Sequence, residues 1–189
     1  MRFFTRELWL GAQNVGRSKE NHDRWQEVFH EYRTQLEALR PRLTEQAYAF
    51  FTDESLHDGE LLELRVIDGS RPAPLNAEVR RPWHSSNDNP VRVEMTVLDA
   101  YDQHVWRLSY AHLRRVMVDF PSDQRLFRGA GEGFGDWGYD ELTDGGDGFL
   151  RHEVLFASGS TLLFEFKGVG ISRTSRESVT AGQSDSLRA

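Results

Sequence analysis

The stretch VRVEMTV, residues 91–97, decides the fold class of this chain. Apolar and polar side chains alternate along it without interruption, so the apolar ones share one face of a strand. Similar strand patterns recur at residues 62–66, 105–110, 113–120, 149–156 and 161–166. The Ser158-Gly159-Ser160 sequence between the last two segments is typical of a tight hairpin turn. A further edge strand is expected at 77–81, inside a proline-marked stretch.

The first fifty residues follow the helical period instead. Thr5 is a suitable N-cap for a short helix, and Pro41 ends a longer one or begins the next. The longer helix carries one apolar face, formed by Trp25, Val28, Phe29, Tyr32, Leu36 and Leu39. A second helical pattern runs to about Thr52, so the two helices should form a hairpin.

Helices at about 5–52 followed by strands at about 60–168 predict an α+β domain. We expect the N-terminal helix hairpin to pack on a mostly antiparallel sheet of five or six strands. Residues 1–172 would form a single domain, and the Ser-rich segment 173–189 a disordered tail. The segment between Pro121 and Phe149 shows no regular period and is expected to be a loop.

Composition excludes several classes of protein. The 189 residues include 30 Asp and Glu against 23 Lys and Arg, and the resulting net charge of −7 disfavours nucleic acids and anionic membranes as partners. No cysteine is present, which excludes thiol nucleophiles, Cys-ligated zinc and disulfides. No apolar run approaches the ~20 residues of a membrane helix, and the N-terminus lacks the apolar core of a signal peptide. We therefore expect a cytoplasmic protein.

The segment 131–148 has the most unusual composition, with six carboxylates and no Lys or Arg. Its residues 133–138 match G-x-G-x-x-G by letter, but no helix follows and the acids would repel a phosphate, so no nucleotide or other cofactor is predicted. Three interpretations remain open. The segment is a flexible solvated loop, a recognition surface for a basic partner, or a calcium site without EF-hand spacing.

As a recognition surface, the segment would use Trp137 and Tyr139 as anchors. Asp136, Asp140 and Glu141 would form its charged rim and attract a basic protein. No catalytic residue is assigned. The alternative is a metal-dependent enzyme or a small-ligand-binding domain, whose site residues would be His57, Asp58, Asp144 and Asp147. Against a metal role, Asp58-Gly59 is also a common turn pair.

The opening Phe3-Phe4-Thr5-Arg6-Glu7-Leu8-Trp9 resembles the start of a bacterial family, a domain of unknown function, that begins Phe-Phe-Thr-Lys-Glu-Leu-Trp. Residues 137–141 and the hairpin strands at 152–156 and 164–166 are also similar to segments of small immunity proteins from bacterial toxin systems. The resemblance implies a bacterial setting and no catalytic residue. The leading expectation is therefore a non-enzymatic protein that binds another protein, in its sharpest form an immunity-like protein that masks the basic surface of a toxin.

Overall fold

The computed structural model describes residues 1–13, 19–69, 90–120, 126 and 133–176. Its helical part consists of α1 (Arg6–Ala12), α2 (Lys19–Leu39), the 3-10 turn η2 (Arg40–Arg42) and α3 (Glu45–Asp53). The edge strand expected at 77–81 and most of the expected tail lie outside these residues. No helix in the described ranges is long and apolar enough to span a membrane.

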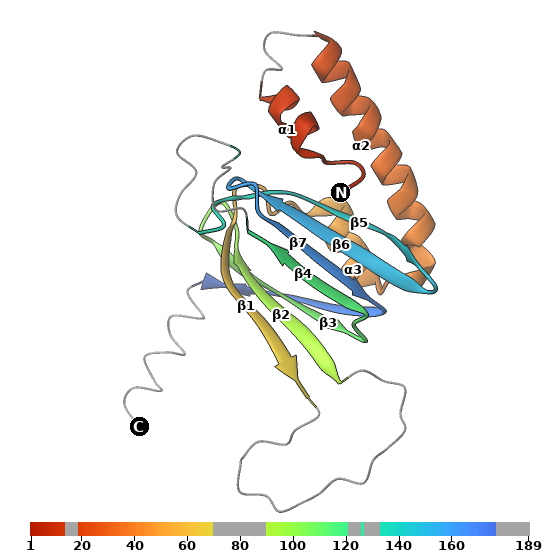
Figure 1. Ribbon diagram of the computed structural model, residues 1–189, viewed down its shortest axis with the longest axis vertical. Coiled ribbons are helices and arrows are strands. Elements are labelled where there is room, and N and C mark those ends of the chain that lie inside the picture. The colour runs from red at the N-terminus through yellow and green to blue at the C-terminus, as the bar shows by residue number, and fades with distance from the viewer. Residues whose placement is uncertain (14–18, 70–89, 121–125, 127–132, 177–189) are drawn as a thin grey trace, which may run out of the picture.

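The strands form two four-stranded antiparallel sheets within the described ranges (Figure 1). One has the order β1-β2-β3-β8 and the other β4-β7-β6-β5. Their bounds are β1 Glu60–Asp68, β2 Val91–Leu98, β3 His104–Ala111, β4 Arg115–Asp119, β5 Trp137–Gly146, β6 Phe149–Phe156, β7 Thr161–Phe166 and β8 Gly168–Ser175. The α+β class and the antiparallel pairing are confirmed, but two sheets replace the expected single sheet of five or six strands.

The two sheets are joined by a bent ladder. Ala111 pairs with Gly168 at the end of β3–β8, and Arg115 pairs with Glu165 at the start of β4–β7. Three residues, 112–114, therefore oppose two, 166 and 167, across the corner. His112 takes the left-handed conformation there, with φ of 53°. Such a bulge bends a strand, so β3–β4 and β7–β8 act as two long strands that each cross from one sheet into the other.

The sheets also meet at their other edge. An isolated antiparallel bridge joins Glu60 to Asp136. Beside it, the Asp58 amide donates to the Trp137 carbonyl at 2.8 Å, and the Trp137 amide donates to the Gly59 carbonyl at 2.7 Å. The start of β1 and the start of β5 are therefore held together, and the inner faces of both sheets enclose one core. That core includes Val93, Met95, Leu108, Tyr110, Leu142, Val154, Phe164 and Phe166.

The helices begin and pack largely as expected. Thr5 caps α1 by accepting a hydrogen bond from the Leu8 amide at 3.3 Å, and Pro41 lies in η2 between α2 and α3. Along α2, the buried residues of the expected apolar face are Tyr32, Leu36 and Leu39. The two arms of the expected helix hairpin pack on different strands, α2 against β5 and α3 against β8.

One local expectation was wrong, and one expected boundary is shifted. The segment expected to be a loop contains β5, and the expected tail begins inside β8. Both strands are poor in apolar residues, so neither shows a clear period of two. β8 forms because its backbone continues the ladder against β3. β5 forms because its backbone pairs with β6 in an antiparallel ladder, and its polar side chains find partners elsewhere in the fold.

Candidate functional site

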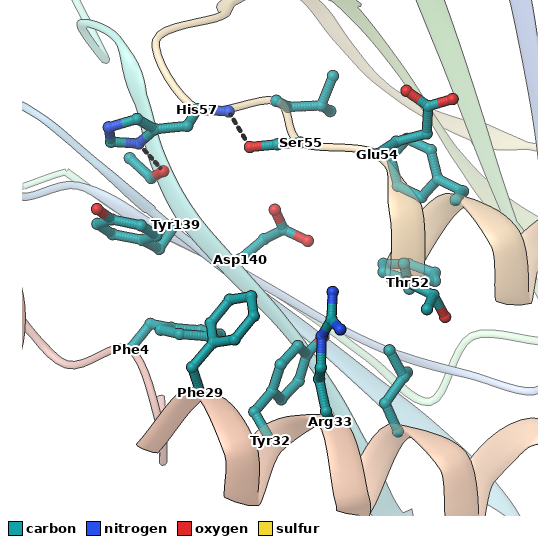
Figure 2. Close-up of a pocket in the computed structure, with 15 residues that line it drawn as sticks. Phe4, Phe29, Tyr32, Arg33, Thr52, Glu54, Ser55, His57, Tyr139 and Asp140 are labelled. Carbon is teal, nitrogen blue, oxygen red and sulfur yellow. Dashed lines mark hydrogen bonds between the residues drawn. The ribbon is translucent and has the colours of Figure 1, made fainter. Parts of the chain in front are cut away.

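A cavity of about 150 Å³ lies between α2, α3 and β5 (Figure 2). Its aromatic lining consists of Phe4, Phe29, Tyr32, Phe50, Phe51 and Tyr139. The charged or ionisable groups other than tyrosine that line it are Arg33, Glu54, His57 and Asp140. The lining comes from four separate parts of the chain: the N-terminal segment, α2, the end of α3 with the turn after it, and β5.

Asp140 reaches this cavity because β5 is bulged. Trp137 pairs with Phe156 and Tyr139 pairs with Leu155, so Gly138 is the extra residue. The bulge changes the alternation of side chains, and Trp137 and Asp140 come to lie on the same side of the strand. The Trp137 indole donates to Asp140 Oδ1 at 3.0 Å. The carboxylate is thus held from the core side while 21% of the side chain stays exposed.

A second donor holds the other oxygen of this carboxylate. His152 Nε2 lies 3.1 Å from Asp140 Oδ2, and His152 Nδ1 lies 2.7 Å from the Tyr110 hydroxyl. A carboxylate accepts, so we assign the proton to Nε2, which makes Nδ1 the acceptor for Tyr110. Burial, with the Asp140 charge adding to it, raises the pKa of Tyr110 well above its ordinary value, so the phenol remains a donor. The result is a chain from Tyr110 through His152 to Asp140.

The aromatic wall is rigidly supported. The Tyr139 ring stacks on Phe4 at a centroid distance of 5.6 Å and on His57 at 4.7 Å. Tyr32 accepts a hydrogen bond from the Leu142 amide at 3.1 Å, which ties α2 to β5. Burial, together with the Asp140 charge, raises the pKa of Tyr32 far above its ordinary value. The tyrosines of the wall are therefore neutral at physiological pH.

The N-terminal segment is fastened beside this wall by a buried carboxylate. Glu141 is fully buried and accepts hydrogen bonds from the Phe3 amide at 2.8 Å and the Phe4 amide at 3.1 Å. It also accepts from the Arg2 amide. Charge-assisted bonds of this kind are about twice as strong as neutral ones. They place the Phe4 ring against Tyr139, where it forms part of the cavity.

Arg33 stands opposite Asp140 on α2. Its guanidinium points into the space below the carboxylate (Figure 2) and lies 5.2 Å from the Phe29 ring centroid. No carboxylate in the described ranges lies within ion-pairing distance of Arg33. The other acid of the rim, Glu54, is paired with Arg173 at 3.4 Å. Asp140 and Arg33 are therefore an opposed negative and positive charge on the two sides of the cavity.

His57 contributes to the rim through its ring. Its Nδ1 donates to the Gly138 carbonyl at 2.6 Å, and its Nε2 lies 3.6 Å from Asp58 Oδ1. Asp58 itself forms the turn into β1, with φ of 63°, and the Gly59 amide donates to Leu56. The turn role considered for Asp58-Gly59 is confirmed.

The residues expected to form a partner-binding surface do not share one surface. Trp137 and Glu141 are fully buried, so neither can anchor a partner on the outside. Tyr139 is half-buried among aromatic rings, and Asp140 lies in the cavity. Asp136 is exposed at the start of β5. These residues do not form one surface because they belong to a strand, whose successive side chains point to opposite faces.

The four residues considered for a metal site are also separated. Asp58 contacts Trp137 at the start of β5, whereas Asp144 lies seven residues along the strand. At ~3.3 Å per residue, that separation is roughly 23 Å. Asp144 is paired with Arg42 at 2.8 Å and Asp147 with Arg114 at 3.3 Å. No group of three or more His, Asp or Glu residues with metal-binding geometry occurs in the described ranges.

Sequence reasoning did not place Tyr110, His152 or Arg33 at this cavity. One signal for His152 was available, because it occupies an inward position between Leu150 and Val154 in a strand that is otherwise apolar on that face. A histidine there needs polar partners inside the core. Comparisons with protein-family models, with curated proteins and with solved structures found no match for this chain.

Proposed function

We propose that this protein binds a small molecule in the cavity between α2, α3 and β5. The observation that carries the proposal is the Asp140 carboxylate, which both Trp137 and His152 hold in place at an aromatic cavity. A charge beside a core is costly unless it is hydrogen-bonded, and small-molecule sites combine apolar walls with a few well-placed polar groups.

The size of the cavity limits the ligand. An engineered apolar cavity of about 150 Å³ accepts benzene, and the volume here is about 150 Å³. The part of the ligand inside the cavity should therefore hold roughly six to ten non-hydrogen atoms. Polar groups of the ligand would extend toward Asp140 and toward the rim.

The test is ligand screening by protein-detected NMR with a variant that fills the cavity. Ser55 lines the cavity on the loop after α3, so Ser55→Phe should occupy its volume. Ser172→Phe adds the same ring at an exposed position of β8 and serves as the control. Compounds of about benzene size should shift resonances of the wild-type and control proteins, and these shifts should disappear in Ser55→Phe. Undiminished binding to Ser55→Phe would contradict the proposal.

A second candidate function is supported by an acidic groove at the junction of β1 and β5. Its carboxylates are Asp58, Glu60, Asp99, Asp102 and Asp136. Phe134 lines the same groove, and the neighbouring Tyr101 is 81% exposed. This arrangement suits a basic protein partner. In that role the protein would be a bacterial, immunity-like binder that masks the basic surface of a toxin. Of the residues expected to bind the partner, Asp136 would belong to this groove, whereas the buried Trp137 and Glu141 would not contact the partner.

An oligolysine peptide tests this surface by calorimetry. Binding should weaken as salt rises from 50 to 200 mM, and Asp136→Lys should weaken it further because the charge is reversed. Asp147→Lys, on the exposed turn at the far end of β5, is the matched control. Equal losses in the two variants would indicate net-charge attraction alone and would remove the groove from consideration.

A further inference from the structure

We propose that the ligand of this cavity is a small zwitterion of the amino-acid type, with its ammonium group at Asp140 and its carboxylate at Arg33. The inference rests on the proposed function, because it specifies the chemistry of the molecule bound at the same site. Its basis is the opposition of one carboxylate and one guanidinium across an aromatic cavity (Figure 2).

The Asp140 side favours an ammonium group. Trp137 and His152 each donate to one oxygen, which holds the carboxylate in one orientation and leaves further acceptor capacity on both atoms. Aromatic faces also attract cations, and Phe4, Phe29 and Tyr139 line this cavity. The tyrosines contribute as neutral rings because burial raises the pKa of both Tyr32 and Tyr139.

The Arg33 side favours a carboxylate. A guanidinium presents its N–H groups as a planar fork that matches a carboxylate with two parallel hydrogen bonds. In the described part of the chain, no protein carboxylate forms an ion pair with the Arg33 guanidinium. Arg33 follows Tyr32 on α2, and the Tyr32 hydroxyl ties this helix to β5. The backbone that carries the guanidinium is therefore fixed relative to Asp140.

Both charges together select against ligands that carry only one. A simple amine would be attracted by Asp140 and repelled by Arg33. A simple acid would be attracted by Arg33 and repelled by Asp140. The rim does not cancel either charge, since Glu54 is engaged by Arg173 and Asp58 lies beside His57. A zwitterion offers an opposite charge to each group and leaves its side chain for the aromatic wall.

Three probes of matched shape test the inference by calorimetry with the full chain. Phenylglycine carries an ammonium group and a carboxylate on the carbon atom attached to its ring, benzylamine carries only the ammonium group, and benzoate carries only the carboxylate. Phenylglycine should bind at least about tenfold more tightly than either, because one charge-assisted hydrogen bond is worth about a factor of ten or more. Asp140→Asn should reduce the affinity for phenylglycine and for benzylamine.

Arg33→Ala gives the more decisive result, because Arg33 is exposed and its loss leaves the core intact. This variant should reduce the affinity for phenylglycine by about tenfold, and should preserve or improve the affinity for benzylamine. Arg33→Lys should recover part of the loss, since it restores the charge without the fork. Arg24→Ala, an exposed position on the same helix, is the control and should change nothing.

The outcomes separate this inference from the proposed function. If benzylamine binds as tightly as phenylglycine and Arg33→Ala affects neither, the zwitterion is wrong while the cavity remains a ligand site. If none of the three probes binds but neutral compounds do in the NMR screen, the inference also fails alone. If Ser55→Phe leaves the binding of phenylglycine unchanged, both are wrong.

Discussion

Asp140 and His152 face each other diagonally across the β5–β6 ladder, in which Asp140 pairs with Val154 and His152 pairs with Leu142. Their side chains meet with His152 Nε2 3.1 Å from Asp140 Oδ2. Diagonal neighbours on a sheet come within reach of each other when their side chains are long enough. This contact connects a fully buried histidine to a carboxylate at the cavity, and so joins the core to the candidate site.

Tyr110→Phe should destabilise the protein by about 1–3 kcal/mol. The change removes the hydroxyl 2.7 Å from His152 Nδ1 and leaves that buried nitrogen without its donor. Urea denaturation followed by circular dichroism measures the difference. Tyr48→Phe is the matched control, because the Tyr48 hydroxyl bonds to Glu37 at the surface and should matter little. Equal stabilities of the two variants would contradict the role of Tyr110.

Glu141→Ala should release the N-terminal segment from β5. Its carboxylate is buried and accepts from the amides of Phe3 and Phe4, each of which would lose its partner. We expect a loss of at least about 2 kcal/mol in the free energy of unfolding. Amide hydrogen exchange at Phe3 and Phe4 should accelerate, whereas exposed Glu63→Ala should leave it unchanged. Protection that persists in Glu141→Ala would show that other contacts hold the segment.

Gly138→Ala should be strongly destabilising because the bulge of β5 has no room for a Cβ atom. A Cβ there would lie 2.2 Å from the Trp9 ring and 2.7 Å from the Leu155 carbonyl oxygen. Forcing such contacts costs about 1–3 kcal/mol or more. Gly168→Ala is the control, since nothing lies within 4 Å of the corresponding position. Thermal melts of both variants compare their melting temperatures. A Gly138→Ala protein as stable as the control would contradict the bulge.

Stability should fall in acid through Glu165. Burial alone would raise the pKa of this carboxyl, but hydrogen bonds and charge from Arg114 and Arg151 outweigh that and hold it below its ordinary value of 4.5. The folded state therefore binds this proton less readily than the unfolded state does. Its contribution is present above about pH 4.5 and is lost as the pH falls through the lower folded value.

Glu165→Gln should reduce the loss of unfolding free energy as the pH falls, here called the acid limb of the stability curve. Glu165 bonds to Arg114 at 2.9 Å and to Arg151 at 2.7 Å, and Arg114 stands at the corner where β3 continues into β4. Urea unfolding at a series of pH values from 7 downward measures the slope. Glu63→Gln, at an exposed position of β1, should keep the wild-type slope. An unchanged slope in Glu165→Gln would assign the acid limb to other carboxylates.

The sequence by itself determined the elements whose signal is local. A period of two or of 3.6 depends only on neighbouring residues. It therefore made three elements predictable: β2, the hairpin of β6 and β7, and the apolar face of α2. The Thr5 cap was predictable for the same reason, since the side chain bonds to an amide three residues away. Composition likewise excluded cysteine chemistry, because the chain contains no cysteine.

Only the tertiary structure decided what β5 is and what Asp140 faces. An acidic, glycine-rich segment has no local reason to be a strand, yet Glu141 is satisfied by amides 137 and 138 residues away in the sequence. The bulge at Gly138 then turns Asp140 toward His152 and opposite Arg33. Such partners are set by the packing of distant elements. The chain alone could therefore name Asp140 and Glu141 as notable, but could not distinguish a carboxylate that fastens the fold from one that faces a cavity.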